Sequence, residues 1–202
     1  GSGRPEDWFI GQAHVFEEKD AYDILKPKYR VGPTAREVAA PIYDRVKDLS
    51  ELEKKQYLDL NLWLPGDILL KADKMSMAHS LELRVPFLDR EVWGLAAALP
   101  AAAKADARTT KIALRRAAAR TLPAASAARK KLGFPVPVRD WLRQEPYTSR
   151  VRAVFSRPAA AEFFDPRARH SMLNQHLHGG DCWLQIWCVY GFLIWYEQFF
   201  GA

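Results

Sequence analysis

Cysteine is scarce in this sequence, with two residues among 202, Cys182 and Cys188. On a helix these positions point to different faces, so their thiols cannot form a disulfide with each other. We expect both to be reduced and buried, as in cytoplasmic proteins. No secretory leader pattern is visible, and the first residues, 1–3 (GSG), resemble residues left by cloning.

The sequence also lacks an apolar run long enough to span a bilayer. Its most apolar stretch, 182–200, is interrupted by Gln185, Glu197 and Gln198. We interpret this stretch as a helix in a protein core and expect no membrane contact.

Charge of one sign is not concentrated anywhere. The formal net charge is +6 and the pI about 9.4, but the densest basic runs are short, at 115–120 and 129–131, and no aromatic residues interleave with them. A basic helical nucleic-acid binder is therefore a weak hypothesis, which salt-sensitive retention on DNA would favour.

Several catalytic motifs are missing. The sequence has no G-x-G-x-x-G, no P-loop, no serine nucleophile elbow and no C-x-x-C. His176, His178 and Cys182 are the only residues that suggest a metal, and a His-x-His pair on a helix points its rings apart. We expect no metal site and read these histidines as a solvated helix end.

What is present is an ordinary globular balance, with 49% apolar and 27% charged residues, enough for one domain with a core. Nearly every periodic segment predicts helix, and no strand–turn–helix alternation appears, so we predict an all-α chain. Ser50 and Glu53 form a capping box, and Asp67, Asp89 and Thr109 or Thr110 are predicted caps. The expected helices are 17–25, 34–46, 50–64, 67–80, 89–99, 109–121, 140–144, 165–177 and 181–200.

Three segments carry candidate functional residues. In the segment 67–77, Lys74 lies near one helix face and Asp73 beside it; the simpler interpretation is an amphipathic helix whose methionines fill the core. Glu82 and Arg84 project from one side of an extended segment next to apolar residues that we expect to be buried. Either they pair with each other, which the spacing favours, or they bind a polar ligand.

The third segment is the basic turn at 129–135 (RKKLGFP). Lysines beside a glycine-containing loop can reach a phosphate as the loop closes. A solvated basic patch is the usual alternative, and the spacing alone favours it.

These segments, in this order, resemble one family. The block DLNLWLPGDILLKADKMSMAHSLELRVPFLD at 59–89 is similar to the signature of the synthetase domain of class B, glutamine-hydrolysing asparagine synthetases. KKLGFPVP at 130–137, with Trp141-Leu142, resembles that family's later block, and 187–200 resembles its C-terminal helix. WFIG at 8–11 and VF at 15–16 are compatible but weaker.

The resemblance implies a function. In this family an N-terminal cysteine glutaminase releases ammonia, and the synthetase domain adenylates the aspartate side chain with Mg-ATP before ammonia displaces AMP. Lys131 matches the active-site lysine, and a lysine on a closing loop suits the charge that develops on phosphate. Asp67, Glu82 and Arg84 match positions in or near the aspartyl-adenylate pocket.

The sequence also departs from the pattern of this family. The family's S-G-G-x-D-S loop, its acidic G-x-G-x-D-E segment and the glutaminase cysteine are absent. We therefore expect residues 1–202 to be the helical C-terminal part of an α/β synthetase domain of the adenine-nucleotide-hydrolase-like (PP-loop) type, inactive alone and without bound nucleotide. Its partners would be the missing glutaminase and PP-loop portions. Apolar surface left exposed would favour a dimer or a larger species.

Two alternatives remain open. Related amide-forming enzymes, the β-lactam synthetases and lasso-peptide cyclases, share the 59–89 block more loosely and differ in carboxylate and nucleophile. The chain could also be a non-catalytic helical module that docks to a separately encoded nucleotide-binding half.

Overall fold

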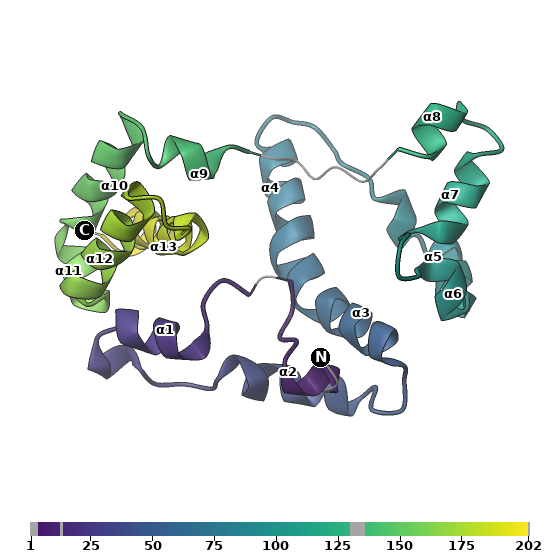
Figure 1. The fold of residues 1–202 in the computed structure, drawn as a ribbon, viewed down its shortest axis with the longest axis horizontal. Helices are drawn as coiled ribbons and strands as arrows, with labels where there is room; N and C mark the ends of the chain where they lie inside the picture. Colours follow the sequence, from purple (N-terminus) through teal and green to yellow (C-terminus); the bar gives the residue numbers. More distant parts are fainter. Residues whose placement is uncertain (1–3, 13, 130–135, 202) are drawn as a thin grey trace. The chain divides into compact units, whose positions relative to one another are not determined.

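A computed structural model describes residues 4–12, 14–129 and 136–201 (Figure 1). The described residues form helices and no strand, apart from isolated bridges between Leu25 and Phe164 and between Ala105 and Thr110. The all-α prediction is therefore confirmed. The chain divides into two compact units, one made of 1–49 and 136–202 (unit 1) and the other of 50–135 (unit 2).

Unit 1 joins the two ends of the chain. Its elements are η1 (Pro5–Asp7), α1 (Glu18–Ile24), η2 (Pro27–Tyr29), α2 (Ala35–Asp44), α9 (Val138–Trp141), α10 (Tyr147–Phe155), α11 (Pro158–Phe163), α12 (Pro166–Leu177) and α13 (Trp183–Phe200). Unit 2 contains α3 (Glu51–Asn61), η3 (Leu64–Leu69), α4 (Leu70–Met77), η4 (Pro86–Leu88), α5 (Arg90–Ala98), α6 (Ala101–Lys104), α7 (Ile112–Ala118) and α8 (Ala124–Ala127).

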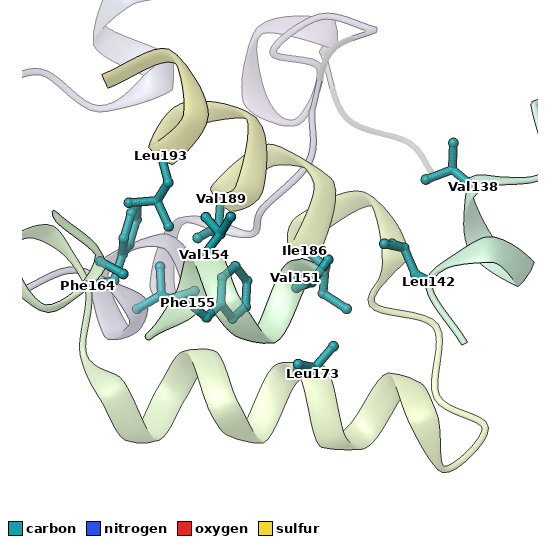
Figure 2. Packing of buried hydrophobic residues seen from close by; sticks show 12 residues of the cluster. Val138, Leu142, Val151, Val154, Phe155, Phe164, Leu173, Ile186, Val189 and Leu193 are labelled. Carbon is teal, nitrogen blue, oxygen red and sulfur yellow. The ribbon is translucent and has the colours of Figure 1, made fainter. Parts of the chain in front are cut away.

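The core of unit 1 lies where α10, α12 and α13 meet. Figure 2 shows Ile186, Val189 and Leu193 projecting from one face of α13 toward Phe155 of α10 and Leu173 of α12. All of these side chains are at most 2% exposed. Burying a side chain of this size contributes roughly 1.5–3 kcal/mol, so this cluster holds unit 1 together.

Polar contacts close one end of this core. His176 is fully buried, with Nδ1 3.2 Å from the carbonyl of Gly180 and Nε2 3.0 Å from the carbonyl of Arg139. Arg143 donates to the carbonyls of His176 and Gly180. The prediction that the histidines form a solvated helix end is wrong for His176, because its ring ties α9 to the end of α12.

Helix caps follow the predictions in part. The capping box of Ser50 and Glu53 is confirmed, and Asp89 accepts from the amides of Glu91 and Val92 at the start of α5. Neither threonine caps α7, since that helix starts at Ile112 after a left-handed residue, Lys111. A turn held by Asp106, which accepts from the amides of residues 108 and 109, displaces the helix start.

Unit 2 buries few of its side chains. Among its described residues, Leu58 is the one in the buried class. The prediction that Met75 and Met77 fill a core is wrong in this chain, because they are 62% and 54% exposed. The described part of unit 2 thus leaves much of α4 uncovered.

The cysteines differ from expectation as well. Cys182 is partly buried and Cys188 is exposed, although both are free thiols. In the part of the chain that the structure describes, no helix is both long and apolar enough to cross a membrane.

Candidate functional site

Asp67 lies in a widened helical turn. Pro65 lacks the amide that an α-helix would need, and the chain continues through η3 as a π-helix rather than breaking. Asp67 does not cap α4; its carboxylate pairs with Lys71 one turn later, with Nζ 3.2 Å from Oδ1. Such π-turns are frequent at functional sites. In this turn the Asp67 carboxylate forms an ion pair with a side chain in place of the predicted helix cap.

Glu82 and Arg84 pair with each other, as their spacing favours. Arg84 Nη2 lies 2.5 Å from Glu82 Oε1, and the side chains of Arg84 and Glu82 are 83% and 69% exposed. The expected burial is wrong, because the flanking apolar side chains, Leu83 and Phe87 among them, are themselves exposed. An exposed ion pair contributes little to stability, so stability alone gives weak reason for these charges.

Among the candidate residues that the structure describes, Glu82 and Arg84 are the two joined by an ion pair. No hydrogen bond or ion pair among the described residues joins Asp67 to Glu82 or Arg84. Asp73 and Lys74 are exposed on α4. Lys131 lies outside the described residues.

Arg115 is a residue that sequence reasoning missed. Its Nη1 donates to the carbonyls of Ala127 at 3.2 Å and Arg129 at 2.8 Å, and its Nε donates to the carbonyl of Thr110. One guanidinium therefore anchors the segment that leads directly into residues 130 and 131. The sequence showed only two adjacent arginines, and nothing in the pattern distinguished Arg115 from Arg116.

Neither a metal-ligand cluster nor the cavity of unit 1 involves the candidate residues that the structure describes. Among the described residues no group of three or more His, Cys, Asp or Glu side chains could hold a metal ion. A cavity of about 300 Å³ lies in unit 1, lined in part by Trp8, Tyr22 and Arg30, and none of the candidate residues lines it.

The described chain is helical, and most residues of its 59–89 block are exposed. A family model described as asparagine synthase matches residues 5–197, and the chain belongs to this family. No solved structure matches at a comparable level of significance.

Two curated relatives are named as asparagine synthetases. The chain is 41% identical over 200 residues to a protein of Mycobacterium tuberculosis (strain ATCC 25618 / H37Rv) provisionally named asparagine synthetase (glutamine-hydrolyzing). It is 40% identical over 193 residues to asparagine synthetase (glutamine-hydrolyzing) 1 of Bacillus subtilis (strain 168). These alignments cover 98% and 95% of this chain but 30% of each relative, so the chain spans less than a third of their length.

Proposed function

We propose that this chain is the C-terminal helical part of the synthetase domain of a glutamine-hydrolysing asparagine synthetase. In the whole protein, the aspartate side-chain carboxylate would attack ATP with release of pyrophosphate, and ammonia from glutamine would then displace AMP to form the amide. ATP, magnesium, aspartate and glutamine are thus ligands of the whole protein, and a cytoplasmic location is part of the proposal.

The observation that carries the proposal is the exposure of the family-like block. Residues 59–89 hold the longest match to the family pattern, yet Leu81, Leu83 and Phe87 are between 50% and 64% exposed. Apolar side chains in such a cluster ordinarily face a partner surface. The relatives are more than three times as long as the match, which supports the rest of the polypeptide as that partner.

Roles follow for the candidate residues. Lys131 would place an ammonium beside the reacting phosphates and stabilise the charge that builds up on them. The exposed Glu82–Arg84 pair and Asp67 would border the aspartyl-adenylate pocket once the remaining segments close it. A charge pair that is weak in water becomes stronger when its site is closed from solvent.

The test is aspartate-dependent exchange between ATP and pyrophosphate, measured on the full-length gene product and on this chain. We expect exchange in the full-length protein and none in this chain. Lys131→Ala should lower the full-length rate by at least about 100-fold, the range seen when a charge-stabilising group is removed. Lys130→Ala is the matched control, because it removes the adjacent lysine and gives the same net charge as Lys131→Ala.

Other outcomes contradict the proposal. Exchange by this chain alone would mean that it holds a complete nucleotide site. Exchange in the full-length protein with another carboxylic acid, and not with aspartate, would move the chain to a β-lactam synthetase or a cyclase of the same family. Equal losses of exchange rate in Lys131→Ala and Lys130→Ala would mean that Lys131 has no role that its neighbour lacks.

A further inference from the structure

The ring of His176 lies between two backbone carbonyl groups. Its Nδ1 is 3.2 Å from the carbonyl oxygen of Gly180, and its Nε2 is 3.0 Å from that of Arg139. A neutral histidine carries one N–H, so it can donate to one of these oxygens and must turn a bare nitrogen toward the other. A histidine protonated on both nitrogens donates to both oxygens.

Burial makes this difference large. The side chain of His176 has no exposed surface, so solvent does not compete for its ring nitrogens. A bare nitrogen that faces a carbonyl oxygen lacks a hydrogen bond and repels that oxygen, and this costs more in a buried site than in water. Protonation of the second nitrogen replaces the repulsive contact with a charge-assisted hydrogen bond.

The turn after α12 brings the carbonyl of Gly180 to the ring. Gly179 has a φ of 100°, in the left-handed region, and the amide of Gly180 donates to the carbonyl of Gln175 at 2.9 Å. A Cβ at Gly180 would lie 2.8 Å from that carbonyl oxygen, so a larger residue would push the turn away from α12. The two glycines therefore hold an acceptor against Nδ1.

The end of α12 also favours a positive charge here. His176 lies in the last turn of this 12-residue helix, where carbonyl groups without helical partners carry partial negative charge. The carboxylate of Asp181, in the turn that follows, is within electrostatic reach of the ring. Both groups stabilise the ring in its charged form.

Two arginines near the ring act against a positive charge. Arg139 is paired with Asp181, so its charge is largely offset. Arg143 donates to the carbonyls of His176 and Gly180. Because the Gly180 oxygen lies between the Arg143 guanidinium and the ring and accepts from both, it reduces their repulsion, and the geometry favours the charged ring.

We propose that His176 is protonated on both ring nitrogens in the folded protein at neutral pH and acts as a pH-sensitive clasp between α9 and the turn that joins α12 to α13. The charged ring holds α9 through the carbonyl of Arg139 and the turn through the carbonyl of Gly180. Loss of a proton at alkaline pH removes one of these bonds and loosens the contact. The clasp lies within unit 1 and does not depend on the proposed enzymatic function.

The sign of the pH effect distinguishes a charged ring from a neutral one. A proton that is bound more tightly in the folded state stabilises the fold at lower pH, and this stabilisation is lost as the pH rises. A ring that is buried in its neutral form gives the opposite trend, because it must take up a proton in acid.

The groups around the ring keep their charges between about pH 6 and pH 9, where carboxylates are ionised and guanidinium groups protonated. Burial raises the pKa of the Cys182 thiol, so it stays neutral over this range. The charged neighbours from α9 and from the turn are Arg139, Asp140, Arg143 and Asp181.

The experiment compares the full-length gene product with its His176→Gln variant by hydrogen exchange in residues 138–142 and 178–183. Glutamine can donate to one carbonyl but does not titrate, and comparing the two proteins at each pH cancels the effect of pH on exchange itself. Near pH 6.5 the variant should exchange roughly 10-fold faster or more, and the two rates should converge toward about pH 9. His178→Gln, at an exposed position of the same turn, is the matched control and should exchange as the wild type does at every pH.

A ratio of rates that stays constant or grows with pH would overturn the proposal, as would the same pH dependence in His178→Gln. A second measurement reads the ring directly in the folded wild-type protein, by nitrogen NMR of isotope-labelled histidine rings near neutral pH, with His176 assigned by its absence from the spectrum of His176→Asn. Two protonated nitrogens are expected on this ring. One bare nitrogen would overturn the proposal, whether or not His176→Gln folds.

Discussion

At the scale of single residues, Arg169 has more unpaired buried donors than any other described side chain of unit 1. It is 4% exposed, and its Nε and Nη1 atoms have no hydrogen-bond partner among the described residues. Desolvation lowers the pKa of its guanidinium, and the carboxylate of Asp165 opposes that shift. A buried cation with unpaired donors costs stability unless something else supplies the missing bonds.

We therefore predict that Arg169→Met stabilises this chain. Methionine keeps the aliphatic bulk and removes the unpaired donors, so the free energy of unfolding should rise by about 1–3 kcal/mol, measured by urea denaturation. Arg167→Met, at an exposed position of the same helix, should change it little. A loss of stability in Arg169→Met would mean that buried water satisfies the guanidinium.

Arg115 makes a second residue-scale prediction, which rests on the proposed function. Its hydrogen bonds to residues 127 and 129 fix the backbone just before Lys131, so Arg115→Ala should lower aspartate-dependent exchange in the full-length protein by roughly 10-fold or more. Arg116→Ala, at the exposed neighbouring position, should leave the rate near wild type. A loss in Arg116→Ala alone would contradict this positioning role.

At the scale of elements, an ion pair ties α9 to the connection between α12 and α13. Arg139 Nε donates to Asp181 Oδ1 at 2.9 Å, and this hydrogen bond is the main reason that the pKa of Asp181 lies below its usual value. A carboxylate with a lowered pKa in the folded state stabilises the fold above its unfolded pKa. That contribution is lost as the pH falls through the lowered pKa of the folded state.

The stability that this ion pair gives unit 1 should therefore be lost as the pH falls below about 5, and Asp181→Asn should make this fall in stability smaller. The measurement is the urea midpoint as a function of pH. Asp48→Asn removes an exposed carboxylate of the same unit that takes part in no ion pair of the described residues, and it should leave the slope unchanged. An identical slope in wild type and Asp181→Asn would contradict the prediction.

Helices were predicted well from the sequence where a capping residue comes directly before apolar residues with helical spacing. α12 begins after Asp165, which accepts from the amides of residues 167 and 168, and its bounds match the expected range closely. α10 and α11 were missed, although Val151, Val154 and Phe155 of α10 have helical spacing. Their short lengths and the prolines at their starts, Pro146 and Pro158, hid the pattern, and burial in the core stabilises these helices instead.

At the scale of the whole molecule, the two units differ in how many of their described side chains are buried. Unit 1 has a continuous apolar cluster, whereas the buried class in unit 2 contains Leu58 alone among its described residues. Local stability follows buried apolar contact, so the two units should differ in their protection from solvent exchange.

We expect amides of α10, α12 and α13 to be protected in hydrogen exchange of this chain, and those of α4, α5 and α7 to exchange much faster. In the full-length protein, α4 and the residues that follow it to α5 should become protected, because other segments would cover them. Equal protection of α4 in both proteins would contradict the proposal that the 59–89 block packs against the rest of the polypeptide.

The sequence by itself determined the helical class, several caps and the family, because these depend on local hydrogen bonds and on residue patterns that need no distant partner. Tertiary structure decided which apolar positions are buried. His176 was expected in solvent and lies in the core, while Met75 and Cys188 were expected in the core and are exposed. A helix pattern shows that a face is apolar, but burial depends on whether another surface packs against it.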